Sequence, residues 1–110
     1  MDDRSAGETF TSTITVERRL ARLQLAGELD LHGAEKLAAD ADALPLDEVD
    51  AVELDAGSLT FIDSAGLHAI LVLHQECQQR AIEMRLTATS APVERVMAMA
   101  GVGELLRGSA

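Results

Sequence analysis

Apolar and polar residues alternate in two stretches near the start of the chain, residues 11–16 and 22–25. In the second stretch, leucines alternate with Arg22 and Gln24. A period of two residues is typical of strands with one buried face. The polar residues 17–19 lie between the two stretches, so the pattern predicts two strands joined by a hairpin turn.

After residue 30 the apolar residues recur every three or four positions. One helical stripe consists of Ala34, Leu37, Ala38, Ala41 and Leu44. This spacing predicts a helix with one buried face. Pro45 ends the helix, because the residue before a proline avoids helical backbone angles. Residues 50–55 predict another strand, and Ala56-Gly57-Ser58 has the composition of a turn.

The longest apolar helix is predicted from Gly66 to about Arg80. Its core-facing stripe is Leu67, Ile70, Leu71, His74 and Cys77, and Ala69, Val72 and Leu73 widen this apolar face. Residues 84–88 alternate as a further strand. Residues 90–101 predict a helix that starts near Pro92 and ends at Gly101. Residues 104–107 are too few to assign.

This order of elements indicates an α/β fold with a mixed sheet, in which an antiparallel hairpin is followed by parallel strands. The 110 residues form one domain. We predict a disordered N-terminal tail over residues 1–8 and the domain over residues 9–110. Binding surfaces of such sheets gather at the carboxyl ends of the parallel strands. Asp30 and the pair Asp63-Ser64 both follow such ends, so we expect them on one face.

Charge narrows the possible partners. Asp and Glu outnumber Lys and Arg by 19 to 9, for a formal net charge of −10. This charge repels the phosphates of nucleic acids and anionic membranes, and it favours a basic protein partner. Aromatic residues make up only 2% of the chain, which argues against a site that stacks nucleic acid bases.

The N-terminus, the apolar stretches and the cysteine content together predict the cellular location of the protein. The polar, acidic start is unlike a signal peptide, and no stretch of ~18 apolar residues predicts insertion into a membrane. Cys77 is the single cysteine, and its place in the apolar helical pattern predicts a buried core thiol. A cytoplasmic location follows as the expectation.

The candidate chemistry lies in the stretch from Leu59 to Leu67, where a predicted strand gives way to a helix. Ser64 stands there beside Asp63. The first free N–H groups of a helix favour negative charge, so a phosphate on Ser64 would be stabilised. The other interpretation is structural, because Asp and Ser are both common N-caps. The spacing alone leaves both interpretations open.

Catalytic interpretations find little support. Ser64, His68 and a nearby Asp are the residue types of a hydrolase triad, but the Gly-x-Ser-x-Gly elbow is missing, and Ser and His one turn apart on a helix rarely align. His32, His68 and His74 include no His-x-x-x-His pair, and no glycine-rich phosphate loop is present. We therefore expect no enzymatic activity, no metal and no cofactor.

Several motifs together resemble a known family. They are Gly27-Glu28-Leu29-Asp30, Asp63-Ser64-Ala65-Gly66-Leu67, Ser90-Ala91-Pro92-Val93 and Met99-Ala100-Gly101-Val102. In this order they are similar to the sulfate transporter and anti-sigma factor antagonist (STAS) domain, and the resemblance runs from about Thr11 to Arg107. It implies a single-domain STAS-like fold whose helices pack mainly on one face of the mixed sheet.

The resemblance also implies a function. In stand-alone bacterial members, the anti-sigma factor antagonists, the serine after the aspartate is phosphorylated by a partner that is both anti-sigma factor and serine kinase. Carried over, the phosphorylated residue is Ser64, and the unphosphorylated chain binds the kinase and so releases a sigma factor. The partner-binding residues implied are Asp30, Asp63, Ser64, Ala65, Gly66 and His68. A PP2C-type phosphatase is expected as a second partner. The chain itself is expected to be a monomer or a weak dimer.

Two residues depart from the family pattern. Ala65 stands where a second hydroxyl is frequent, and His68 replaces a residue that is small in many antagonists. His68 lies one turn after Ser64, where it either pairs with a phosphate or simply faces solvent. The alternative function is a non-phosphorylated STAS subunit of a lipid or anion transporter or of a sensory complex.

Overall fold

The strands of the chain pair in the order in which they occur. The computed structural model describes residues 9–107, and within them four strands form one sheet in the order β2-β3-β4-β5. The strands are β2 (Thr11–Glu17), β3 (Leu20–Leu29), β4 (Ala51–Ile62) and β5 (Glu83–Thr89). β2 is antiparallel to β3, whereas β3, β4 and β5 are mutually parallel. The predicted mixed sheet is confirmed, and the tail predicted for residues 1–8 lies outside the described residues.

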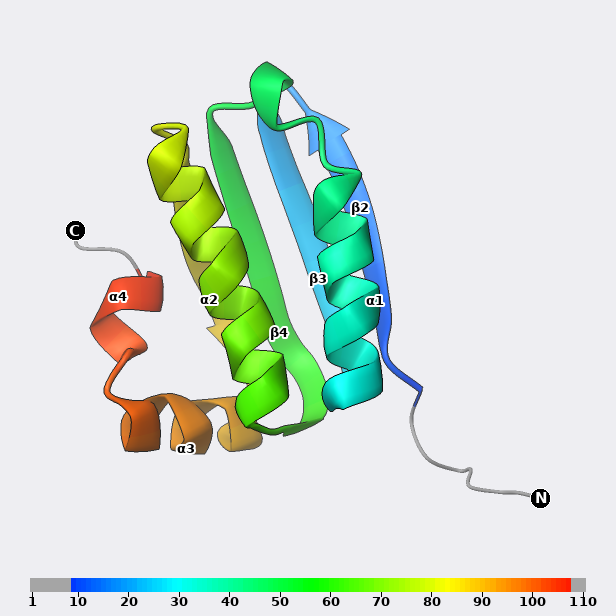
Figure 1. Ribbon diagram of the computed structural model, residues 1–110, viewed down its shortest axis with the longest axis vertical. Coiled ribbons are helices and arrows are strands. Elements are labelled where there is room, and N and C mark those ends of the chain that lie inside the picture. Colours follow the sequence, from blue (N-terminus) through cyan, green and yellow to red (C-terminus); the bar gives the residue numbers. More distant parts are fainter. Residues whose placement is uncertain (1–8, 108–110) are drawn as a thin grey trace.

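Two long helices cover one face of the sheet. The helices are α1 (Leu31–Asp42), α2 (Ser64–Gln79), α3 (Ala91–Ala100) and α4 (Gly103–Arg107), with a short 3-10 helix at Leu46–Glu48. α1 and α2 lie side by side in front of the sheet, and α3 crosses near its lower end (Figure 1). No helix within residues 9–107 has the length and apolar character to span a membrane.

The core lies between the sheet and these helices. Leu23, Leu54 and Leu86 are partners across β3, β4 and β5, and all three are buried. The neighbouring partners Arg22 and Glu53 point to the opposite face, where they form an ion pair of 3.0 Å. Because side chains alternate along a strand, this register buries an aliphatic layer on one face and leaves the other face polar.

The turn predicted at residues 56–58 is wrong, because β4 runs through it. Gln24 pairs with Asp55 and Ala26 with Ser58, so β4 uses two residues where β3 uses one. The extra residue forms a bulge. The N–H of Gly57 donates to the Asp55 carboxylate at 2.9 Å. This local hydrogen bond lets the strand continue past residues whose composition is typical of a turn.

The buried face of α2 differs from the predicted one at two positions. Leu67, Ile70, Leu73, His74 and Cys77 are buried as predicted, but Leu71 is only partly buried and Val72 is 46% exposed. Cys77 is fully buried, and burial together with the negative charge of Glu76 raises the pKa of its thiol to about 11. The predicted core thiol is therefore confirmed.

This arrangement predicts different costs for two adjacent truncations in α2. Ile70 is 1% exposed, so Ile70→Ala should cost about 2–5 kcal/mol of unfolding free energy, because it leaves a cavity in the core. Leu71→Ala should cost less, about 1–2 kcal/mol, because Leu71 is only partly buried against the core and loses less apolar burial. Urea unfolding of both variants measures the difference. Equal losses would mean that α2 packs on the sheet in another rotation.

Candidate functional site

Two loops meet at the carboxyl edge of the sheet. Leu29 at the end of β3 is the partner of Ile62 at the end of β4. The next residues along the two strands are therefore Asp30 and Asp63, and the N–H of Asp63 donates to the carbonyl of Leu29 at 3.4 Å. The prediction that Asp30 and Asp63 share one edge is confirmed.

Each aspartate caps the helix that follows it. The Asp30 carboxylate accepts a hydrogen bond from the N–H of Gly33 at 2.9 Å, and the Asp63 carboxylate accepts one from the N–H of Gly66 at 3.0 Å. Both aspartates have extended backbones and precede the first helical residue. The same Asp-x-x-Gly device therefore starts α1 and α2, and in each case the carboxylate satisfies an N–H group that the helix leaves unpaired.

Because Asp63 caps α2, the Ser64 side chain has no capping role. Ser64 is the first residue of α2 and is exposed. Its hydroxyl makes no hydrogen bond to any residue from 9 to 107. The capping interpretation of the Asp63-Ser64 pair therefore applies to Asp63. The Ser64 hydroxyl is exposed to solvent at the N-terminus of α2.

Gly66 allows the two loops to touch. A Cβ added to Gly66 would lie 2.3 Å from the carbonyl oxygen of Leu29 and 2.7 Å from its Cγ. Gly33 has the matching role in α1, where a Cβ would lie 2.9 Å from the carbonyl oxygen of Glu28. Gly66 is buried, so it shapes the edge from beneath, while Asp63 and Ser64 remain accessible.

The edge also carries exposed apolar side chains that sequence reasoning missed. Leu31, next to Asp30, is 63% exposed, and Phe61, two residues before Asp63, is 44% exposed. We call the set Asp30, Leu31, Phe61, Asp63 and Ser64 the docking edge. No local signal marked Leu31, because it stands three residues before Ala34 and so continues the apolar stripe of its helix. The docking edge combines acidic groups, one hydroxyl and apolar surface.

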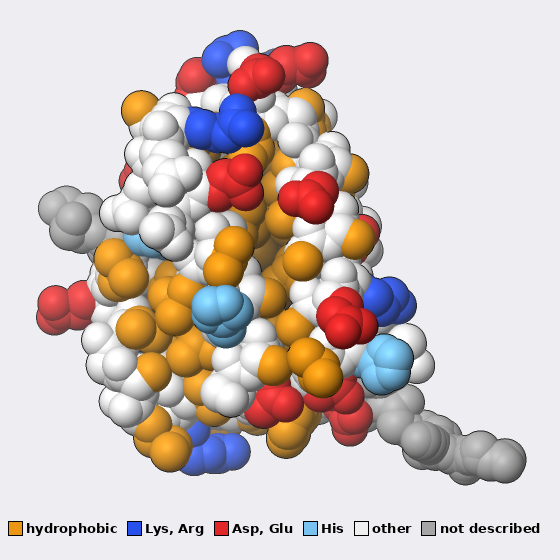
Figure 2. Space-filling view, viewed as in Figure 1, with side chains coloured by type: hydrophobic (Ala, Val, Ile, Leu, Met, Phe, Trp, Pro, Cys, Tyr) orange, Lys and Arg blue, Asp and Glu red, His pale blue; other side chains and the backbone are white. Residues whose placement is uncertain are grey.

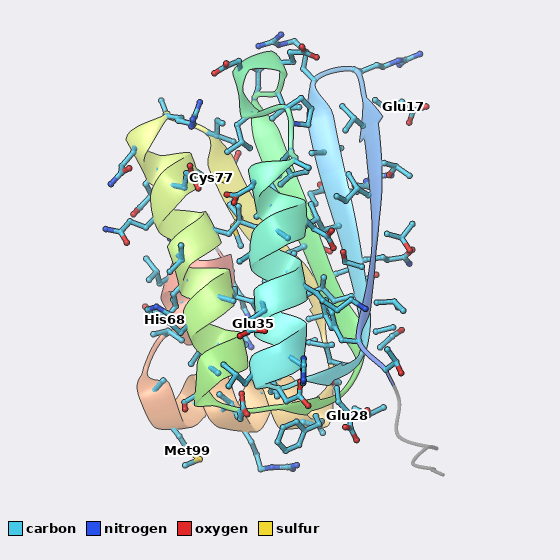
Figure 3. All side chains as sticks on the ribbon, turned by 45° about the vertical axis from the view of Figure 1, so that its right-hand side comes forward. Glu17, Glu28, Glu35, His68, Cys77 and Met99 are labelled. Atoms are coloured by element: carbon cyan, nitrogen blue, oxygen red, sulfur yellow. The ribbon has the colours of Figure 1, made fainter. Side chains whose placement is uncertain are left out.

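Ala65 and His68 extend the docking edge along α2. Ala65 is partly buried and His68 is exposed. His68 lies at about the height of Glu35, which is on the neighbouring helix α1 (Figure 3). No hydrogen bond joins His68 to Ser64 among residues 9–107, and no group of three or more His, Cys, Asp or Glu in that range is placed to hold a metal ion.

Two of the hollows on the described surface bear on the site. One, of about 380 Å³, is on the open face of the sheet and is lined mainly by polar side chains such as Thr15, Gln24 and Thr87. The other, of about 280 Å³, runs between α1 and α2 and starts at Leu31 and Ala65. Figure 2 shows hydrophobic side chains gathered in the hollow between the two helices. Of these two hollows, the second, the α1–α2 groove, includes Leu31 and is therefore continuous with the docking edge.

The fold and this edge define an α/β domain with its loop-to-helix junctions gathered at one end of a mixed sheet. The model of the STAS domain family matches residues 12–109. The chain therefore belongs to the STAS domain family, and the identification from its motifs is confirmed.

Known proteins of this fold are similar to the chain. An anti-sigma F factor antagonist from Paenibacillus polymyxa is 29% identical over 85 residues, which are 76% of this chain and 73% of that protein. The anti-sigma factor antagonist SpoIIAA in its unphosphorylated form has a TM-score of 0.73 and 27% identity, covering 93% of this chain and 88% of that one. The phosphorylated form of the Bacillus cell fate determinant SpoIIAA has a TM-score of 0.70 and 25% identity, covering 93% and 91%.

A transporter protein also has this fold. A sulfate transporter family protein from Wolinella succinogenes has a TM-score of 0.70, covering 84% of this chain and 75% of that one. Its sequence identity is 20%, so the likeness concerns the fold alone.

The close contact at Gly66 generates a prediction. Gly66→Ala should lower the unfolding free energy by about 1–3 kcal/mol, because the added methyl forces the β3 and β4 loops apart, although alanine favours helix. Gly57→Ala is the control, because its Cβ would meet only the Asp55 carboxylate at 3.2 Å and the Ala88 Cβ at 3.4 Å. Thermal and urea unfolding compare the two. A stabilised Gly66→Ala would contradict the close approach.

Proposed function

We propose that this chain is an anti-sigma factor antagonist. Its docking edge binds an anti-sigma factor that is also a serine kinase while Ser64 is unphosphorylated, and this binding releases a sigma factor. Phosphorylation of Ser64 ends the binding. The observation that carries the proposal is the exposed Ser64 hydroxyl, which Asp63 relieves of capping. The likeness to SpoIIAA, solved in both phosphorylation states, supports it.

A phosphate on Ser64 is compatible with the fold and opposed to docking. It adds about 1.5 to 2 negative charges at a helix N-terminus, where the dipole favours them. Against a partner surface shaped for a hydroxyl, one facing carboxylate at ~6 Å would oppose the phosphate by about 1–5 kcal/mol over a reasonable dielectric range. This free energy corresponds to roughly one to three decades in affinity.

In this proposal the chain acts by binding, without catalysis, in the cytoplasm, and a PP2C-type phosphatase restores the Ser64 hydroxyl. The alternative is a non-phosphorylated subunit of a transporter or sensory complex. The two functions differ at Ser64, because only the antagonist requires a kinase to modify this hydroxyl.

Substitution of Ser64 tests the switch. Incubation with candidate anti-sigma factor kinases and ATP should add one phosphate to the wild type and none to Ser64→Ala, as read by intact mass. Ser64→Ala should bind the kinase like the wild type. Ser64→Asp should fold but bind roughly 10-fold or more weakly, because its carboxylate reproduces part of the phosphate charge.

Stability must be measured beside binding. Both Ser64 variants should keep the unfolding free energy within about 1 kcal/mol of the wild type, because Asp63 and not Ser64 caps α2. If wild type, Ser64→Ala and Ser64→Asp bind the kinase equally and no phosphate reaches Ser64, the switch is excluded and the alternative function gains support.

Asp30 offers a second test, because capping and docking can be separated there. Asp30→Ala should cost about 1 kcal/mol of stability through the lost hydrogen bond to Gly33, whereas Asp30→Asn keeps an acceptor oxygen and most of the stability. Both variants should weaken kinase binding if the negative charge of Asp30 contacts the partner. Isothermal titration and urea unfolding separate the two effects. Undiminished binding by Asp30→Asn would leave Asp30 as a cap only.

A further inference from the structure

The α1–α2 groove is an apolar channel bordered by acidic side chains. Its floor and walls consist largely of alanines, among them Ala34, Ala38 and Ala69, with Leu73 beneath. Val72 on its rim is 46% exposed. In Figure 2 the groove appears as a hollow between the two helices, with acidic side chains along its sides. A channel with this lining gains free energy when apolar side chains displace its water.

The dimensions of the groove match a helix. Its lining runs from Leu31 to Asp42 on α1 and from Ala65 to Glu76 on α2. At a rise of 1.5 Å per residue, each wall is about 16 Å long, or about three helical turns. The walls are helices whose backbone groups are paired internally, so an extended peptide in the groove would leave its own backbone groups without partners. A helix brings its hydrogen bonds with it.

The charge around the groove selects a basic occupant. Glu35, Asp42 and Glu76 line it, whereas no Lys or Arg among residues 9–107 does. A second copy of this chain, with its formal charge of −10, would bring like charge to this acidic rim. The groove also begins at Leu31, which belongs to the docking edge, so a partner seated on Ser64 can reach it.

We propose that the α1–α2 groove receives a helix of the partner protein that carries an apolar stripe flanked by Lys or Arg. This inference rests on the proposed function, since the helix belongs to the partner that contacts Ser64. It adds a second contact surface that extends away from the phosphorylation site along α1 and α2.

Two synthetic helical peptides of about 18 residues, long enough to form a helix, test the chemistry of the groove. Both carry leucines at positions i, i+3, i+4 and i+7, and their remaining positions are rich in lysine in one peptide and in glutamate in the other. Measured by fluorescence anisotropy, the lysine peptide should bind at least roughly 10-fold more tightly, and salt should reduce this difference.

Neighbouring alanines of α1 supply matched variants. Ala38 and Ala39 are both exposed, but only Ala38 lines the groove. Ala38→Arg should weaken binding of the lysine peptide about 10-fold or more, because it fills the groove and places a charge there, whereas Ala39→Arg should stay within about 2-fold. If Ala38→Arg fails to fold, Glu35→Gln combined with Glu76→Gln should abolish the preference for lysine over glutamate.

Several results would overturn the proposal. These are binding of neither peptide, equal binding of both, identical behaviour of Ala38→Arg and Ala39→Arg, or a dimer of this chain that Ala38→Arg dissociates in light scattering. Ser64→Asp should retain peptide binding, because Ser64 does not line the groove. Failure of the peptide tests therefore leaves the phosphorylation switch standing, and absence of Ser64 phosphorylation leaves the groove result standing.

Discussion

The contact between Gly66 and the carbonyl of Leu29 holds the docking edge together. Parallel pairing places Leu29 beside Ile62. The loops that follow β3 and β4 each lead into a helix, and they can pack closely only if one of them has no side chain at the point of contact. A side chain at position 66 would occupy the space of that carbonyl oxygen, which lies 2.3 Å from the Cβ position. The missing side chain therefore sets how closely α2 approaches the end of β3, and hence how closely Asp30 and Asp63 approach each other.

The contact between Gly66 and Leu29 also separates the roles of Asp63 and Ser64. With Gly66 close to the loop, its N–H points at the Asp63 carboxylate and is capped by it. Because the Asp63 carboxylate supplies the side-chain cap of α2, the side chain of Ser64 is not needed for capping. Ser64 is exposed and Asp63 is partly buried. Because the cap comes from Asp63, a modification of the Ser64 hydroxyl does not remove the hydrogen bond that starts α2. In the proposed function, stability and recognition therefore depend on neighbouring residues.

Much of this arrangement could be predicted from the sequence, because periodicity fixes the order of elements and the order fixes which strand ends share an edge. Asp30 and Ser64 were placed in this way. Residues 56–58 were misassigned because composition does not reveal that the Asp55 carboxylate binds the Gly57 N–H and keeps the strand going. Leu71 was misplaced because a stripe gives the helix face only to within one position. The α1–α2 groove depends on the spacing of two helices, which no local pattern encodes.

The charge of the chain constrains how a phosphate on Ser64 can act on a basic partner. A phosphate adds about two negative charges to a formal net charge of −10, which makes the chain about one fifth more negative. The added charge strengthens the long-range attraction between the chain and a basic partner, although salt screens this attraction beyond about 8 Å. A phosphate that weakens binding must therefore act at contact distance and outweigh this attraction. The partner surface facing Ser64 must then be acidic or apolar, while the surface facing Glu35 and Glu76 is basic. A partner of this proposed switch needs both kinds of surface, separated by no more than the length of α2.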